Sequence, residues 1–207
     1  LCEATGGIYD ITVYPVYELW DFHGDEDFVP EEEDIKNALK AVDYENVHLE
    51  GNKLTFDSPD TMIDLGSAAK GYVSQKIKEL LTEKGCTSAL IDLGRNISTV
   101  GAKPNGNNWK IGLQLPFAAS GELLDVVEVR NQCAISSGTY ERCFEKDGIF
   151  YHHILDPANG YPARNGLISV TVVHESGFLS DALSTSLFVM GKEKAIAFWQ
   201  AHKDFEM

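Results

Sequence analysis

The chain lacks several features that would assign it to a specialised class of protein. It has no run of about 18 apolar residues, so no segment has the length and composition of a membrane-spanning helix. Its four cysteines include no CxxC pair, which argues against a structural zinc site. It begins at Leu1-Cys2 with neither an initiator methionine nor a signal peptide, so we expect a fragment or a processed product.

Basic residues are also scarce. There are 17 Lys and Arg against 32 Asp and Glu, which gives a formal net charge of -15. Such a field repels nucleic acid and anionic membrane surfaces, and we predict no nucleic-acid partner. A phosphorylated small molecule remains open, because a bound divalent cation can reverse the local sign. Much of the acid excess, including the segment GDEDFVPEEEDI (24–35), is typical of a solvated surface.

The four cysteines leave two alternatives open. A disulfide such as Cys133–Cys143 fits the spacing, but spacing alone does not establish a pairing. Free, mostly buried thiols are the interpretation that we favour.

The hydrophobic pattern predicts an α+β protein with mixed, largely antiparallel sheets packed against helices. We expect helices from Pro30 to Val42, Ala68 to Lys84 and Leu179 to Met190, and a further one over 192–203. Residues 46–56 have the pattern of a hairpin. Further strands are expected over 88–92, 109–114, 124–129, 150–155 and 167–173. No repeat or linker divides the sequence, so we expect one domain over residues 1–207.

Two segments combine residues that are suited to phosphate and metal chemistry. MIDLGSAAKGYVSQKI (62–77) reads as a strand, a turn of small residues and a helix N-terminus, with Asp64 at the strand end and Lys70 in the helix. SDALSTSLF (180–188) places Asp181 and Thr185 on one helix face, as hard oxygen ligands suited to Mg²⁺. The alternatives are an ordinary turn capped by Asp64, and a helix cap with a packing threonine.

The segment YHHILDPANGYP (151–162) contains adjacent histidines. Neighbouring residues of a strand point to opposite faces, so His152 and His153 do not both reach one metal ion. At most one of them serves a site, and a lone strand histidine is often structural. Ser136-Ser137-Gly138 has neither the elbow motif nor a partner base of a serine hydrolase.

Seven stretches, in order over nearly the whole chain, resemble the ApbE family of FAD:protein FMN transferases. They are GGIYDITVYPVYELWDF (6–22), IDLGSAAKGY (63–72), DLGRNI (92–97), SSGTYERCF (136–144), YHHILDPANGYP (151–162), ISVTVV (168–173) and SDALSTSLFVMG (180–191). The resemblance implies an ApbE-like, T-fold-related α+β domain. It also implies transfer of FMN from FAD, through a phosphoester bond, onto a Ser or Thr hydroxyl of a target flavoprotein, with release of AMP.

The resemblance also implies roles for individual residues. Mg²⁺ would be held by the side chains of Asp181 and Thr185 and by the backbone carbonyl of Ser67. His153 would take the proton from the incoming hydroxyl, and Asp181 would assist catalysis as well as bind the metal. The residues implied to contact FAD are Ile8, Tyr9, Asp10, Asp64, Lys70 and Ile154.

The sequence departs from the family pattern at three places. We expect that the chain lacks the stretch that precedes GGIYD in the family and the closing strand that follows the last helix. Arg95 stands where the family commonly has a glycine, which puts the backbone geometry there in doubt. The resemblance implies a bacterial cell-envelope protein, periplasmic or at the cell surface and lipid-anchored at full length. An FAD pyrophosphatase that yields FMN and AMP, or a non-catalytic flavin-binding fragment, remains an alternative.

Overall fold

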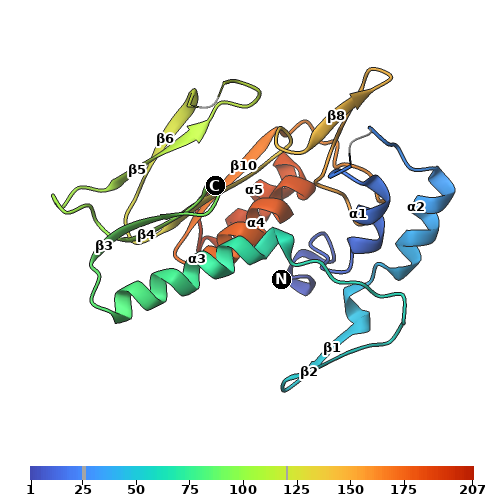
Figure 1. The fold of residues 1–207 in the computed structure, drawn as a ribbon, viewed down its shortest axis with the longest axis horizontal. Helices are drawn as coiled ribbons and strands as arrows, with labels where there is room; N and C mark the ends of the chain where they lie inside the picture. The colour runs from blue at the N-terminus through green and yellow to red at the C-terminus, as the bar shows by residue number, and fades with distance from the viewer. Residues whose placement is uncertain (25–26, 120) are drawn as a thin grey trace. The chain divides into compact units, whose positions relative to one another are not determined.

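A computed structural model describes residues 1–24, 27–119 and 121–207 (Figure 1). The chain separates into two compact units, and each is described by itself. The first contains Leu1–Leu65 and Thr139–Asn165, and the second contains Gly66–Gly138 and Gly166–Met207. Helices and antiparallel strand pairs occur in both units. The single domain expected over residues 1–207 stays a prediction.

The first unit contains two short helices and two hairpins. Its helices are α1 (Tyr14–Trp20) and α2 (Glu32–Ala38), and its hairpins are β1 (Val47–Glu50) with β2 (Lys53–Phe56) and β8 (Cys143–Lys146) with β9 (Ile149–His152). Three 3₁₀ turns connect these elements, at Glu3–Thr5, Leu39–Ala41 and Tyr44–Asn46. Pro15 in the first turn of α1 fits a helix start, because proline lacks the amide hydrogen that this turn leaves unpaired.

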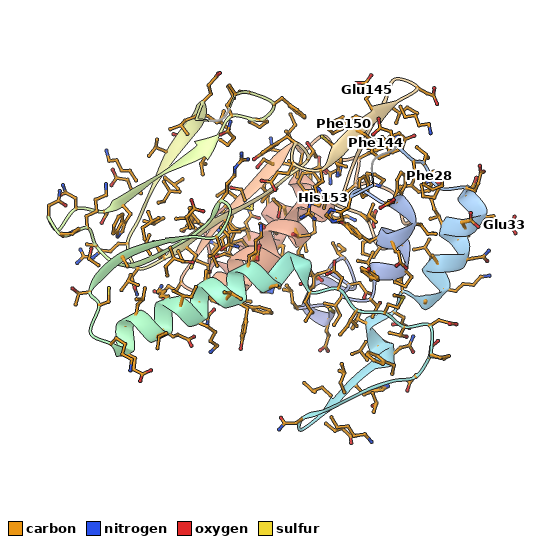
Figure 2. All side chains as sticks on the ribbon, viewed as in Figure 1. Phe28, Glu33, Phe144, Glu145, Phe150 and His153 are labelled. Carbon is orange, nitrogen blue, oxygen red and sulfur yellow. The ribbon has the colours of Figure 1, made fainter. Side chains whose placement is uncertain are left out.

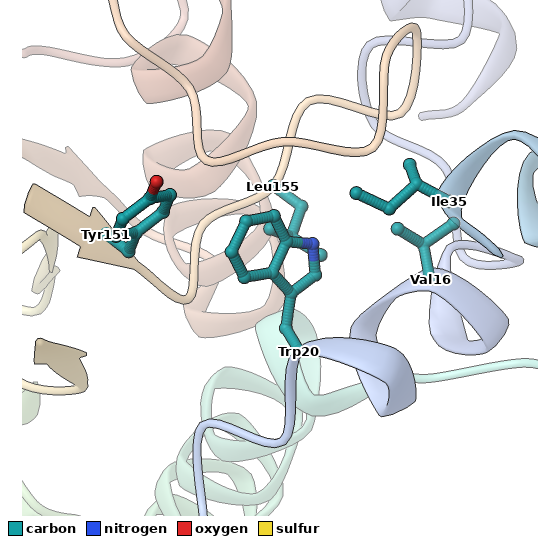
Figure 3. Close-up of a cluster of buried hydrophobic side chains, with 5 residues drawn as sticks. All are labelled: Val16, Trp20, Ile35, Tyr151 and Leu155. Carbon is teal, nitrogen blue, oxygen red and sulfur yellow. The ribbon is translucent and has the colours of Figure 1, made fainter. Parts of the chain in front are cut away.

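The core of the first unit forms around Trp20. Val16 and Trp20 lie four residues apart, on one face of α1, and pack with Ile35, Tyr151 and Leu155 (Figure 3). The Trp20 indole Nε1 donates to the Gly160 carbonyl at 2.8 Å, which fixes the turn after β9 to α1. A side chain at Gly160 would collide with Ile35 at 2.6 Å, and Gly160 has a φ of +74°, so this turn requires glycine.

The second unit is built on a four-stranded antiparallel sheet in the order β10-β7-β4-β3 (Figure 1). Its strands are β3 (Ser88–Asp92), β4 (Asn96–Gly101), β7 (Cys133–Gly138) and β10 (Ser169–His174). The helices α3 (Gly66–Glu83) and α4 (Gly177–Met190) pack on this sheet and against each other, and α5 (Lys192–His202) packs on α4. A hairpin of β5 (Trp109–Gln114) and β6 (Leu123–Val129) contributes Ile111 and Val129 to a cluster with Ala134.

Most of the elements predicted from the sequence are present. The hairpin over 46–56 and the strands over 88–92 and 109–114 are confirmed, as are the helices near 68–84, 179–190 and 192–203, with shifts of one or two residues at their ends. The helix expected to reach Val42 was predicted too long, because α2 ends at Ala38 and a 3₁₀ turn follows. The strand expected over 150–155 stops at His152, and Leu155 makes only an isolated bridge to Pro162.

Other expectations were wrong or incomplete. Residues 62–65 form no strand, so Asp64 lies in an irregular segment before α3. The structure has four free thiols, as favoured, but only Cys133 is buried. Asp27 and residues 31–34 are exposed, as expected for a solvated acidic surface, whereas Asp25 and Glu26 lie outside the described residues. Within residues 1–24, 27–119 and 121–207, no helix is long and apolar enough to cross a membrane.

Candidate active site

The Asp181 carboxylate is the chemically most unusual group of the second unit. It lies in the first half of α4, only 6% exposed, and its Oδ2 accepts the Gly71 amide hydrogen at 2.7 Å. Burial raises the pKa of the Asp181 carboxyl from 3.8 to about 6, although the Gly71 amide, the Lys70 charge and the Asn96 amide act in the opposite direction. A carboxylate that is this costly to ionise, in a protein with abundant surface acids, indicates a functional group.

Two glycines allow α3 to approach Asp181 closely. A side-chain carbon at Gly71 would meet the Gly177 carbonyl oxygen and would come within 2.6 Å of the Asp181 Cβ. At Gly177 it would meet the Gly71 carbonyl oxygen at 2.5 Å and the Ser74 hydroxyl at 2.8 Å. In the structure, the neighbour that approaches the main chain of Gly71 is α4.

The contact with Asp181 also bears on Ser67. In a regular α-helix the amide of one residue donates to the carbonyl four residues earlier, so the usual partner of the Gly71 amide is the Ser67 carbonyl. Asp181 competes for this amide at 2.7 Å. The Ser67 carbonyl and the Asp181 carboxylate, which the family resemblance assigns to the same metal ion, therefore share one hydrogen-bond donor, the Gly71 amide.

Thr185 lies one turn after Asp181 on α4, on the same face of the helix. Its Oγ1 is 3.0 Å from the Ser137 Oγ, and that Oγ is 2.7 Å from the Ser184 Oγ. Ser137 lies on β7 and is half-buried, and these partners are hydroxyls rather than a base. The geometry thus agrees with setting a serine hydrolase aside, and it gives Ser137 a role in orienting Thr185.

Asn96 completes the surroundings of Asp181 from β4. It is 1% exposed, and its Oδ1 accepts the Ser74 hydroxyl hydrogen at 3.4 Å. Its Nδ2 is buried without a hydrogen-bond partner, although the amide is close enough to lower the pKa of the Asp181 carboxyl. The Asn96 amide therefore faces the carboxylate without hydrogen-bonding geometry. A buried donor without a hydrogen-bond partner is uncommon in folded proteins, and it marks the surroundings of Asp181 as a candidate site.

The donor set of the second unit fits Mg²⁺. A carboxylate, a hydroxyl and a carbonyl are oxygen ligands, which this ion prefers, and it is commonly held by one or two carboxylates together with substrate phosphates. Among the residues that the structure describes, no three His, Cys, Asp or Glu side chains are grouped to hold a metal ion. With a single carboxylate, the oxygens of a bound substrate would have to supply the remaining ligands.

The histidine pair lies in the first unit. His152 is the last residue of β9 and is 4% exposed, and its two ring nitrogens contact the Ala163 carbonyl and the Ile154 amide. His153, labelled in Figure 2, follows the strand. It is half-buried, and its Nδ1 contacts the Arg142 carbonyl oxygen. The two rings therefore differ in burial, and the prediction that at most one of them serves a site stays a prediction.

The residues predicted to contact FAD have varied surroundings. The Asp10 carboxylate accepts from the Thr12 amide and hydroxyl and from the Tyr44 amide, so it organises its own loop. Tyr9 and Ile154 are buried, Ile8 and Asp64 are half-buried, and Lys70 is exposed on α3. The structure brings Lys70 close to Asp181. The flavin contacts of all six residues stay predictions.

Comparison with known proteins identifies the family. A family model described as the ApbE family matches residues 1–207. The chain belongs to the ApbE family.

Two curated ApbE relatives carry the name FAD:protein FMN transferase. The protein from Treponema pallidum is 36% identical over 211 residues, which cover 94% of this chain and 58% of that protein. The protein from Klebsiella pneumoniae is 36% identical over 202 residues, which cover 96% of this chain and 61% of that protein. The chain therefore spans about 60% of the length of the curated relatives that it matches.

Solved ApbE structures have the same fold. The ApbE protein of Thermotoga maritima matches with a TM-score of 0.88 and 34% identity, over 99% of this chain and 67% of that one. The flavin transferase ApbE of Vibrio cholerae matches with a TM-score of 0.86 and 31% identity, over 98% of this chain and 65% of that one. The predicted α+β architecture, with ApbE-like antiparallel sheets and helices, is confirmed.

Three residues near Asp181 and Thr185 were not predicted from the sequence as part of the candidate site. They are Gly71, Asn96 and Ser137. Their signal was present, since Asn96 and Ser137 lie in DLGRNI and SSGTYERCF, two of the stretches that resemble the family. What the sequence did not provide was the antiparallel pairing that carries both residues to the face of the sheet that meets α3 and α4.

Proposed function

We propose that this chain contains the metal-binding and catalytic elements of an FAD:protein FMN transferase. Its substrates would be FAD and a target flavoprotein with an acceptor Ser or Thr, and its products the flavinylated protein and AMP. The observation that carries the proposal is the buried Asp181 carboxylate, with Thr185 on the same helix face, in an ApbE fold. The names of the relatives from Treponema and Klebsiella support it.

The reaction is a phosphoryl transfer. The acceptor hydroxyl oxygen forms a bond to the phosphorus of the FMN moiety, the bond from that phosphorus to the bridging oxygen of the diphosphate breaks, and AMP leaves with the bridging oxygen. The hydroxyl proton passes to a base. Mg²⁺, when bound, would neutralise the diphosphate oxygens and stabilise the charge on the departing phosphate.

The residues of the second unit would hold the diphosphate half of the substrate. Asp181, Thr185 and the Ser67 carbonyl would provide the protein ligands of Mg²⁺. Lys70 is an exposed cation near Asp181 and is suited to a phosphate oxygen. Asp181 would carry a full negative charge once a cation lies beside it, because an opposite charge favours the ionised form of a buried acid.

His153 would be the base. The ordinary pKa of histidine, about 6.5, suits proton transfer near neutral pH. His153 is half-buried, whereas the His152 imidazole is enclosed and its pKa is lowered by burial. Ile8, Tyr9, Asp10, Asp64 and Ile154 would form the part of the flavin site that this chain supplies.

A direct assay tests the proposal. The chain is incubated with FAD, Mg²⁺ and a flavoprotein subunit that carries an acceptor threonine, and the products are separated by gel fluorescence and mass spectrometry. Covalent FMN on the acceptor together with free AMP is the expected result. Free FMN and AMP without a modified acceptor would show an FAD pyrophosphatase, and unchanged FAD would refute activity of this chain.

The assay is repeated with Asp181→Ala and a matched control. Glu83→Ala removes an exposed carboxylate at the end of α3 and should leave the rate unchanged. Asp181→Ala removes the single carboxylate of the metal set, so transfer should fall to the background rate. Equal rates for the two variants would refute the role of Asp181.

A further inference from the structure

The adjacent histidines differ in which ring nitrogen carries hydrogen. The His152 Nε2 lies 3.1 Å from the Ala163 carbonyl oxygen. A carbonyl oxygen only accepts, so this contact requires a hydrogen on Nε2. The Nδ1 of the same ring accepts the Ile154 amide hydrogen at 3.3 Å. The lone pair of a neutral His152 is therefore already used by the backbone, and His152 is unsuited to act as a base.

His153 has the opposite arrangement. Its Nδ1 lies 3.3 Å from the Arg142 carbonyl oxygen, and its backbone amide donates to the same oxygen at 3.1 Å. The carbonyl again requires a hydrogen on the ring nitrogen that contacts it, which is Nδ1 here. A neutral imidazole has one N–H and one lone pair, so the lone pair of His153 lies on Nε2.

We infer that the Arg142 carbonyl holds neutral His153 in the Nδ1–H tautomer, which makes Arg142 a positioning residue. The atom that takes the proton of the acceptor hydroxyl is then the Nε2 of His153. The catalytic part rests on the proposed function. The assignment of the tautomer rests on the hydrogen bonds alone and stands or falls without any measurement of activity.

Arg142 is itself anchored by its side chain. Its guanidinium Nη1 donates to the Tyr17 hydroxyl oxygen at 3.3 Å, and this oxygen lies 3.2 Å from the His23 Nε2. Arginine only donates, so the Tyr17 oxygen accepts from Arg142. Tyr17 belongs to α1 and packs against the Trp20 core. The carbonyl that orients His153 is thus tied through one side chain to a core helix of the same unit.

The orientation matters because a base acts through a lone pair at a defined point. A ring in the other tautomer would present a hydrogen at Nε2 and could not take a proton there. In the Ser-His-Asp template, a base held in the wrong tautomer costs about 10⁴-fold in rate. Loosening the Arg142 anchor leaves the carbonyl in place, so we expect a smaller loss, of up to about 10²-fold, as for a misplacement of about 1 Å.

The tautomers are read directly by NMR. The whole chain is labelled with ¹⁵N in its histidine rings, and two-bond ¹H–¹⁵N correlations are recorded at about pH 8, where imidazole rings are mostly neutral. His153→Asn assigns the His153 signals, and its amide retains a hydrogen near the position of Nδ1. We expect a protonated Nδ1 for His153 and a protonated Nε2 for His152. A protonated Nε2 on His153, or an even mixture of its two tautomers, would overturn the inference.

Paired variants test the positioning role. Arg142→Met and Tyr17→Phe should each lower kcat for transfer by about 10-fold to 10²-fold at an unchanged KM for FAD, and should shift the His153 ring towards a mixture of tautomers. Arg130→Met and Tyr14→Phe are matched controls, of which Tyr14 lies on the same helix as Tyr17. A wild-type tautomer ratio and kcat in Arg142→Met would refute Arg142 as a positioning residue. If the wild-type chain transfers no FMN, the proposed function fails, and the ring signals still decide the tautomer.

Discussion

Replacing Asp181 by asparagine should make the metal-free protein more stable at neutral and alkaline pH. The amide side chain would keep the shape of the carboxylate and an oxygen for the Gly71 amide hydrogen, but it removes the charge that burial opposes. Burial raises the pKa of the Asp181 carboxyl from 3.8 to about 6. Each pKa unit is worth about 1.4 kcal/mol, so the ionised carboxylate costs the folded state about 3 kcal/mol.

The sign of the pH dependence follows from the raised pKa. Below pH 3.8 the carboxyl is protonated in both the folded and the unfolded chain, and it contributes no difference. Between pH 3.8 and about 6 the unfolded chain loses this proton first, so the stability of the wild type falls relative to Asp181→Asn. Above about pH 6 the full penalty is present. The advantage of the variant should therefore be about 2–3 kcal/mol at pH 8 and less than about 1 kcal/mol at pH 4.

Urea denaturation in EDTA at pH 8, 6 and 4 measures this difference. The fluorescence of Trp109 and Trp199 reports on the second unit, in which Asp181 lies. Glu83→Gln, which neutralises an exposed carboxylate, should match the wild type within about 0.5 kcal/mol at each pH. A variant less stable than the wild type at pH 8, or an advantage that is equal at all three pH values, would contradict a strained carboxylate at position 181.

Three further predictions concern the same residues and the histidines. In a thermal scan at pH 8, Mg²⁺ should raise the Tm of the wild type, raise the Tm of Thr185→Val by less, and leave the Tm of Asp181→Asn unchanged. An equal rise in all three proteins would contradict Asp181 and Thr185 as metal ligands. Gly71→Ala should lower the free energy of unfolding in urea by about 1–3 kcal/mol and lower the rate of FMN transfer, because the added methyl group forces α3 away from α4. A variant as stable as the wild type would contradict the close approach of the two helices. His153→Asn should lower the rate of transfer by about 10²–10⁴-fold and leave the stability unchanged. His152→Ala should lower the stability by about 1–3 kcal/mol, because the Ala163 carbonyl and the Ile154 amide lose their hydrogen-bond partner. A loss of transfer in His152→Ala together with a loss of stability in His153→Asn would exchange the two roles.

The family resemblance and the local periodicity predicted the helices that carry the candidate site. They did not predict the residues that surround Asp181, because those residues are brought together by contacts between distant parts of the sequence. Asp181 and Thr185 could be placed on one helix face because a spacing of four residues is a local property. The partners of Asp181 lie 110 and 85 residues away in sequence, at Gly71 and Asn96. No spacing rule connects such positions, and only the packing of α3 and α4 on the sheet brings them together.

Backbone conformation explains two other differences. Arg95 stands where the family commonly has glycine, and it adopts a φ of +70°, the left-handed conformation that glycine favours. The Arg95 amide donates to the Asp92 carboxylate at 2.8 Å, which helps to hold this turn in the absence of a glycine. The strand expected over 150–155 ends at His152, and the ring of His152, rather than a neighbouring strand, accepts the Ile154 amide hydrogen.

The two histidines differ in the backbone groups that their rings contact. Strand alternation predicts that the two side chains point to opposite faces, and the His153 amide continues the pairing of β9 with β8 by donating to the Arg142 carbonyl oxygen at 3.1 Å. Alternation alone does not show which ring is suited to act as a base. The separation comes from the backbone partners of the rings. Ala163 and Ile154 use both nitrogens of His152, whereas Arg142 contacts the Nδ1 of His153 and leaves its lone pair on Nε2. These hydrogen bonds, and not strand alternation, are the observation that favours His153 over His152 as the proposed base.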